Sequence, residues 1–298
     1  AAAANPTFLA RHPRLPVLYA IGERKNEAGE TEGALHAFSI DPATRALTPL
    51  NSIPAGGGTL CYLQVDPTGS AVVVSSYGAG YVASYSLQAD GLLGVRTSFH
   101  AHAGKGPHPQ QNAPHAHCID FTPDGHFALS ADLGADRIIA YRFDPSTQSL
   151  KPAGQAHEAL PGAGPRHLAF HPGGRFLYCI NELTSTVTAF TFDAATAGLR
   201  EIETIDTLTP GFTGRRWGTL FSIDASTGKL TLVSHAHDGV KHPRHFAIDP
   251  TGRWLLCASH DTDVVVIFAI DQETGRLTAT GRTIPVPSPV CILFMPQS

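Results

Sequence analysis

The sequence predicts an all-β chain of repeated four-stranded antiparallel units, and three observations support this fold class. A Pro/Gly turn between two apolar runs recurs roughly every 50 residues through most of the chain. An apolar strand that ends in Asp, followed by a small polar loop and Leu, recurs in segments such as AFSIDPATRAL and IFAIDQETGRL. No long stretch has the period of an amphipathic helix. Repeats of this length with four short strands are typical of β-propeller blades, so we expect a single propeller domain over residues 1–298.

The strand–Asp pattern predicts where successive blades end. These ends fall near Ile40, Leu87, Phe143, Phe192, Ile223 and Ile270. The inner half of the blade is missing before Ile223, and the chain begins in the middle of the pattern, so one blade is expected to be incomplete and the N-terminal blade truncated. Half a blade would expose strand edges, which favours residues missing from this sequence and predicts that Gly214 and Arg215 lie far apart. The C-terminal SPVCILFMP is expected to pair with the N-terminal blade and close the ring.

Composition limits the class of protein. Apolar residues make up 42% of the 298 residues and charged residues 15%, which is typical of a globular chain. The net charge of −4 includes no basic stripe, so nucleic acid is not expected as a partner. No apolar run is long enough for a membrane span, and no signal peptide is visible. The five cysteines lie in or beside strand-like runs, which predicts reduced thiols and a cytoplasmic protein. We expect either a monomer or a weak homo-oligomer.

Strand direction selects candidate functional residues. Within a blade, antiparallel pairing places the start of the first strand and the end of the second at the same end of the sheet. The strand starts contribute Cys61, Tyr62, His115, His117, Arg166, His167, Arg244 and His245, and the strand ends contribute Glu23, Tyr77, Asp132, Glu182 and His260. We therefore expect a mouth of the central channel that is rich in His, Arg and carboxylate.

These residue types suggest roles. Arg166 and Arg244 can hold an anionic substrate, because a guanidinium matches the geometry of carboxylate and phosphate. Glu182 can act as a general acid or base, and His115 and His117, two apart on one strand, can transfer protons at neutral pH. The alternative for the Arg166–Glu182 pair is a purely structural tie between two strands.

Other motifs favour structural explanations. His115 and His117 have no Cys or acidic partner at metal-ligand spacing, so neither a metal nor an organic cofactor is expected. His171 falls in the turn at the opposite end of its blade, where we expect it only to cap that turn. Strand cysteines such as Cys118 and Cys179 are more often core residues than nucleophiles.

Three segments resemble the seven-bladed propeller lactonase family, which contains propeller-type 6-phosphogluconolactonases and 3-carboxy-cis,cis-muconate lactonizing enzymes. These segments begin PHAHCIDFTPDG, GAGPRHLAFHPGG and PRHFAIDPTG, and the combination GPRH…NEL…STVT is the most specific of their motifs. The resemblance implies a seven-bladed ring with its active site at the channel mouth. It implies catalytic or substrate-binding roles for Arg166, Glu182, Arg244 and a histidine of the PHAH motif, either His115 or His117. Tyr62 and His260 depart from the family pattern.

The leading hypothesis from the sequence is therefore hydrolysis of a small anionic sugar lactone, as in 6-phosphogluconolactonases. In this hypothesis Glu182 or a mouth histidine activates water, while Arg166, His167 and Arg244 bind the substrate. One alternative is an isomerase of the muconate lactonizing type, which needs the same anion clamp and acid–base groups. Another is a propeller without enzymatic activity that binds a peptide or protein on one face.

Overall fold

The computed structural model describes residues 3–208, 218–236 and 238–295, and the chain divides into two units, residues 1–204 and 205–298. The described residues are almost entirely β-strand, with two short 3₁₀ helices, η1 (Pro109–Gln111) and η2 (His260–Thr262). No helix within them is long and apolar enough to cross a membrane. The predicted all-β class is confirmed.

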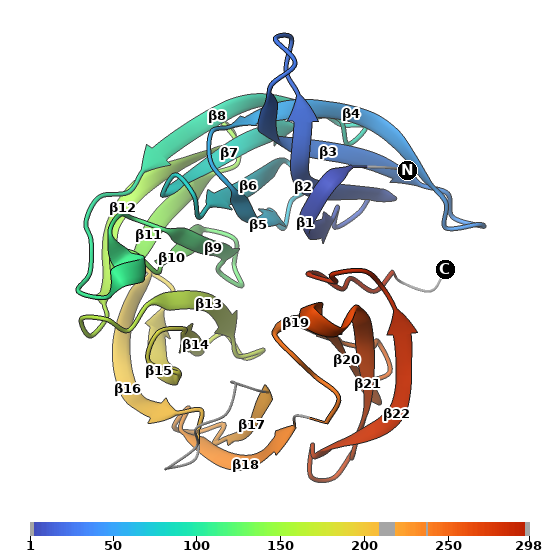
Figure 1. Ribbon diagram of the computed structural model, residues 1–298. Coiled ribbons are helices and arrows are strands. Elements are labelled where there is room, and N and C mark those ends of the chain that lie inside the picture. Colours follow the sequence, from blue (N-terminus) through green and yellow to red (C-terminus); the bar gives the residue numbers. More distant parts are fainter. Residues whose placement is uncertain (1–2, 209–217, 237, 296–298) are drawn as a thin grey trace. The chain divides into compact units, whose positions relative to one another are not determined.

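The first unit contains four antiparallel sheets of four strands each, ordered as in the chain (Figure 1). The first sheet holds β1 (Ala4–Arg11), β2 (Val17–Lys25), β3 (Thr31–Ile40) and β4 (Leu47–Gly56). The second holds β5 (Leu60–Val65), β6 (Ala71–Ser76), β7 (Tyr81–Leu87) and β8 (Leu93–Ala101). The third holds β9 (Ala116–Phe121), β10 (Phe127–Asp132), β11 (Arg137–Asp144) and β12 (Ser149–Glu158). The fourth holds β13 (Pro165–Phe170), β14 (Phe176–Asn181), β15 (Thr186–Asp193) and β16 (Gly198–Asp206), which runs on into the second unit.

Two kinds of turn build each sheet. The Pro/Gly turn joins the first and second strands: Asp66 accepts hydrogen bonds from the backbone N–H groups of Ser70 and Ala71 at 2.6 Å, and Gly69 takes φ 72°. The Asp-containing loop joins the third and fourth strands: Asp41 accepts from the N–H of Thr44 at 2.7 Å. The strand–Asp pattern therefore marks the end of the third strand, and the prediction that blades end there was wrong by one strand. The sequence in fact continues into an outermost strand after each of these loops.

The first strands of consecutive sheets are neighbours within the first unit. β1 contacts β5, β5 contacts β9, and β9 contacts β13, which is the blade arrangement of a propeller (Figure 1). The apolar faces of adjacent sheets share one core. For example, Val73 and Val82 of the second sheet pack with Ile119 and Ala128 of the third. This packing fixes the first strands, and hence the residues at their beginnings.

The N-terminal sheet has all four strands, so the predicted truncation of this blade is wrong. Residues 4–11 supply the first strand although they carry little apolar alternation. Their pairing with β2 has a register irregularity between Ala4 and Phe8, which hides the strand pattern in the sequence.

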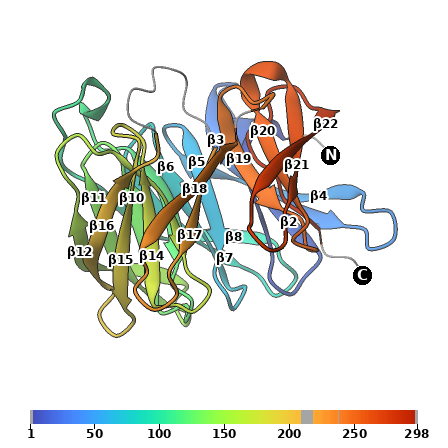
Figure 2. The same ribbon diagram turned by 90° about the horizontal axis from the view of Figure 1, so that it is seen from below.

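The second unit holds one sheet of two strands and one of four. β17 (Gly218–Ile223) pairs only with β18 (Leu230–Ala236) among the described residues, which confirms an incomplete blade there. β19 (Pro243–Ile248), β20 (Trp254–Ser259), β21 (Val264–Ile270) and β22 (Leu277–Pro285) form the complete sheet, whose strands lie side by side in Figure 2. The expected separation of Gly214 and Arg215 lies outside the described residues.

The C-terminal segment contains no strand among its described residues, 286–295. It is tied to its own unit, where the N–H of Ile292 donates to Nδ1 of His245 at 3.2 Å. The predicted pairing of SPVCILFMP with the N-terminal blade would join the two units and stays a prediction.

Candidate active site

A β-bulge opens the first strand in four of the sheets. In each case the pairing with the second strand skips one residue, and the skipped residues are Cys61, His117, Arg166 and Arg244. A bulge removes a residue from the ladder and redirects its side chain, and bulges are common at rims and active sites. The residues that strand direction selected in the sequence therefore share a distinct backbone position, and His117, not His115, is the equivalent of the two arginines.

Four aromatic side chains from three sheets of the first unit lie in contact. The ring of Tyr77, just after β6, stacks on His115 with centroids 4.3 Å apart and meets the edge of His117 at 5.7 Å. The His117 ring in turn lies 5.0 Å from that of His167 on β13. His115 and His117, which the sequence placed on one face, thus contact the same tyrosine. Tyr77 is a member of this group that the sequence did not single out for a chemical role.

Arg166 and Glu182 form the charged part of the same group. Arg166 Nε lies 2.6 Å from Glu182 Oε2, and their side chains are 17% and 35% exposed. Burial raises the pKa of Tyr77, the charge of Glu182 raises it further, and the charge of Arg166 lowers it. Both members of the ion pair therefore lie close enough to Tyr77 to change its pKa, and Tyr77 also contacts the two histidines.

Asp136 holds the loop that precedes Arg166. Its Oδ1 accepts from the N–H of Gly164 at 2.8 Å, and its Oδ2 accepts from that of Gly162 at 2.7 Å. Gly164 O then accepts from the N–H of Glu182 at 2.8 Å, so this single carboxylate supports both partners of the ion pair. Asp136 is 6% exposed and also accepts from Gln111 Nε2 at 2.7 Å. Sequence reasoning missed it, although an Asp after the short loop LGAD is a recognisable turn signal.

Asp132 positions His115 from the end of β10. Its Oδ1 accepts from the N–H of His115 at 2.8 Å, and its Oδ2 contacts Nδ1 of the buried His102 at 2.6 Å. His115 Nδ1 donates to the backbone oxygen of Tyr77 at 2.7 Å, which leaves Nε2 as the ring atom that can accept a proton. The histidine is thus held in an orientation suited to proton transfer.

Tyr62, at the start of β5, packs against other aromatic rings. Its ring lies 4.4 Å from Phe8 and 5.5 Å from His167, and its hydroxyl donates to Asp120 Oδ1 at 2.8 Å. Burial raises the pKa of Asp120 to about 7. Because Tyr62 contacts His167, this pair brings a second titratable carboxyl close to the candidate site.

Glu23 belongs to a neighbouring cavity and not to the group around Tyr77. Its Oε2 accepts from Asn5 Nδ2 at 3.1 Å, and it lines a cavity of about 300 Å³ with Glu32, Gly58 and Thr59. The strand-end pattern therefore predicted that Glu23 lies at the end of β2, but the residue is not part of the group around Tyr77.

The structural interpretations of His171 and the cysteines are supported. His171 Nδ1 accepts from the N–H of Gly173 at 3.0 Å, so the ring caps its turn as predicted. All five cysteines are free, and burial raises the pKa of Cys179 to about 12 and that of Cys257 to about 11. Cys61 is only half-buried, and its Sγ lies 3.2 Å from the backbone oxygen of His117.

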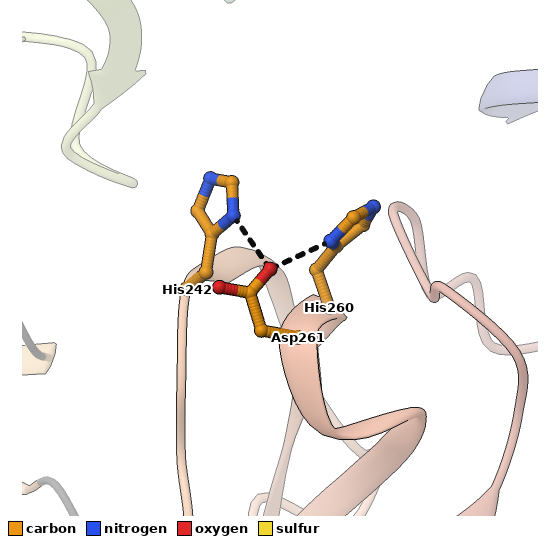
Figure 3. Close-up of side chains that lie close together, drawn as sticks. All are labelled: His242, His260 and Asp261. Atoms are coloured by element: carbon orange, nitrogen blue, oxygen red, sulfur yellow. Dashed lines mark hydrogen bonds and ion pairs between the residues drawn. The ribbon is translucent and has the colours of Figure 1, made fainter.

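In the second unit, Arg244 has an exposed side chain on β19. Burial lowers the pKa of its neighbour His245. A further group at this end of the sheet contains His242, His260 and Asp261, whose candidate ligand atoms all lie within 4.8 Å of one another (Figure 3). It is the only such metal-capable group among the described residues, and His115 and His117 are not part of it. The sequence named His260 but missed its two partners.

The chain belongs to a family of propeller lactonases. Its sequence matches the family described as "Lactonase, 7-bladed beta-propeller" over residues 1–219 and 218–294. The match divides next to the two-stranded sheet, where the repeat pattern is also interrupted.

Named relatives are similar over nearly the whole chain. The chain is 32% identical to a 6-phosphogluconolactonase of Bacillus subtilis over 315 residues, covering 98% of this chain and 88% of the relative. It is 29% identical to a 6-phosphogluconolactonase of Formosa agariphila, covering 92% and 83%. Among solved structures, a periplasmic gluconolactonase of Pseudomonas aeruginosa matches with a TM-score of 0.89 at 28% identity, covering 97% and 88%.

Proposed function

We propose that this protein hydrolyses a small anionic sugar lactone of the 6-phosphogluconolactone type at the bulged strand starts of the first unit. The observation that carries the proposal is the Arg166–Glu182 ion pair, 2.6 Å long, beside the histidine and tyrosine rings around Tyr77. Membership of the lactonase family and the names of the relatives support this substrate class.

The geometry supports a division of roles. Glu182 takes a proton from water as the water oxygen attacks the lactone carbonyl carbon. Arg166 stabilises the negative charge that develops on the carbonyl oxygen. The ring C–O bond then breaks, and the leaving alkoxide oxygen receives a proton from Glu182 or from His117, giving an open-chain hydroxy acid. His115, with Nε2 free to accept a proton, is the second candidate base.

Substrate binding falls to the remaining cations and the aromatic rings. We assign His167 to the anionic group of the substrate, because an imidazole N–H donates to phosphate or carboxylate oxygen. Arg244, in the second unit, keeps the substrate-binding role that the sequence predicts, because a guanidinium matches the same groups. This mechanism uses protein side chains throughout. We infer a cytoplasmic enzyme from the five free cysteines.

The test is a side-by-side assay of the purified protein against 6-phosphogluconolactone and carboxymuconate, with the uncatalysed rates subtracted. Hydrolysis of the first without lactonization of the second is the expected result. Glu182→Gln and Arg166→Ala should each remove the activity while leaving the far-UV circular dichroism spectrum unchanged. The matched control is His171→Ala, at the opposite end of the same sheet, which should retain turnover.

Three outcomes contradict the proposal. Turnover of carboxymuconate alone would support the isomerase. Inactivity toward both compounds would support a binding protein. Wild-type rates in both variants would remove Arg166 and Glu182 from the mechanism.

A further inference from the structure

Two sheets begin with the same three residues in the same backbone arrangement. Pro165-Arg166-His167 opens β13, and Pro243-Arg244-His245 opens β19, with the bulge at the arginine in both. The preceding loops are tied alike to the end of the second strand. The N–H of Glu182 donates to Gly164 O, and at the equivalent place the N–H of His260 donates to His242 O at 3.3 Å. Corresponding residues can therefore be compared one by one.

Three positions differ between these equivalent frameworks. Where the first unit has Gly164, Glu182 and Leu183, the second unit has His242, His260 and Asp261. The backbone is left-handed at the first position in both, with φ 67° at Gly164 and 53° at His242. Glycine adopts this conformation freely, whereas histidine adopts it at a cost. A strained residue retained at a strand end is a reason to look for a function of its side chain.

The three side chains of the second unit converge on one point. Asp261 Oδ1 lies 3.1 Å from His242 Nδ1 and 3.0 Å from His260 Nδ1 (Figure 3). The imidazoles come from different segments, one before β19 and one after β20, and their ring centroids are 5.3 Å apart. The side chains are between about one third and one half exposed, so water can reach the group.

We propose that His242, His260 and Asp261 bind a divalent transition-metal ion of the zinc type. Tetrahedral metal bonds of about 2.0 to 2.2 Å to nitrogen and oxygen place neighbouring ligand atoms about 3.3 to 3.6 Å apart. The two nitrogen–oxygen separations, 3.1 and 3.0 Å, are slightly shorter than this, so the side chains need to move only a little to take up an ion. Two imidazoles and a carboxylate form a donor set that suits zinc, cobalt and nickel ions better than calcium or magnesium. On binding, each neutral imidazole moves its proton from Nδ1 to Nε2, and water completes the coordination.

This site goes beyond the proposed lactone hydrolysis, and its failure would leave that mechanism unaffected, because none of the three ligands is assigned to the reaction. The bound ion would join the loop before β19 to the turn after β20. It would therefore fix the end of the sheet from which Arg244 projects.

The test measures zinc and cobalt binding to the chelator-treated, full-length protein. Isothermal titration should show one zinc ion per chain, and cobalt should give a visible spectrum without a thiolate charge-transfer band. Asp261→Asn keeps an oxygen at the same place but removes its charge. It should weaken zinc binding by about 100-fold or more, which exceeds the loss typical of a residue that only hydrogen-bonds to a metal ligand. His242→Gly should weaken it equally and stay folded, because glycine is the natural residue for this backbone conformation.

The control is His126→Ala, which removes a histidine from an exposed His–Asp pair with a 3.4 Å separation and no second histidine. It should bind zinc as the wild type does. The proposal is overturned if the wild type shows no saturable binding, if His242→Gly and Asp261→Asn bind as tightly as the wild type, or if the cobalt spectrum shows thiolate ligands. In each case the three residues form only a hydrogen-bonded ion pair.

Discussion

The sheets of β13–β16 and β19–β22 present the same Pro-Arg-His strand start with different chemistry beside it. Arg166 faces the carboxylate of Glu182 across its bulge, at 2.6 Å. The guanidinium of Arg244 forms no ion pair with any residue the structure describes. Asp261, one residue beyond the position equivalent to Glu182, is engaged by two histidines. The backbone framework is thus conserved inside the molecule, while the group that accompanies each arginine is not. One scaffold position therefore carries an arginine–glutamate ion pair in one sheet and a histidine cluster in another.

The largest expected difference between the two sheets is kinetic. Arg166→Ala should lower kcat/KM for the lactone by about 1000-fold, because it removes oxyanion stabilisation and the partner of Glu182 together. Arg244→Ala should lower it by about tenfold, chiefly through KM, since it removes only binding of the anionic group. Steady-state kinetics of both variants measure this. Equal losses would show that the two arginines have the same role. A larger loss for Arg244→Ala would show that their roles are reversed.

The support beneath Arg166 can be broken separately. Asp136→Ala leaves the N–H groups of Gly162 and Gly164 and the amide of Gln111 without their buried acceptor. We expect a loss of about 3 kcal/mol in the free energy of unfolding, with reduced kcat. Urea denaturation followed by tryptophan fluorescence, together with the lactone assay, measures both. Asp193→Ala in an exposed turn is the control: it should lose clearly less stability and leave kcat unchanged. A similar loss in the control would mean that Asp136 has no special positioning role.

Asp120 should make stability depend on pH. Its pKa is about 7 in the folded protein against a usual 3.8, so the folded state holds the proton more tightly than the unfolded chain. The resulting stabilisation is complete below about pH 4 and is lost as the pH rises through about 7. Asp120→Asn should remove this dependence and gain about 4 kcal/mol over the wild type at pH 8, relative to their difference at pH 4.

Thermal unfolding of both proteins across this pH range measures the difference. Subtracting one curve from the other cancels the titration of all other groups. A difference that stays constant between pH 4 and pH 8 would show that Asp120 ionises normally in the folded state.

The smallest predicted effects have opposite signs at equivalent positions. Gly164→Ala should destabilise the protein by about 1 to 2 kcal/mol, because the new Cβ would lie 2.6 Å from Leu183 Cγ and φ is 67°. In metal-free buffer, His242→Gly should stabilise it by up to about 1 kcal/mol, because it relieves a left-handed histidine. Denaturant midpoints give both values. Destabilisation by His242→Gly would mean that the imidazole contributes more to folding than the strain costs.

The sequence predicted the strands and the end of the blade where polar residues gather, because strand periodicity and Pro/Gly turns are local signals. It placed Arg166, Glu182, His115 and His117 together correctly within the first unit. It missed Asp136, whose role depends on a left-handed backbone and on contacts with a loop far along the chain. It also missed the partners of His260, since His242 and Asp261 meet only after β19 and β20 pair.

The errors at the two termini have a related cause. The first strand was overlooked because its register irregularity disrupts alternation, and the C-terminal apolar run was predicted as a strand on composition alone. Apolar composition predicts burial, whereas strand formation also needs a free edge with which to pair.

The bulge at the start of four of the first strands has a consequence for how such an enzyme can diverge. Cys61, His117, Arg166 and Arg244 are the residues that the ladder skips, so their side chains can change with little effect on pairing between strands. Selection for a new substrate can therefore act on these places almost independently of selection for folding. A library that varies only the skipped residues should yield a high fraction of folded proteins with altered substrate preference.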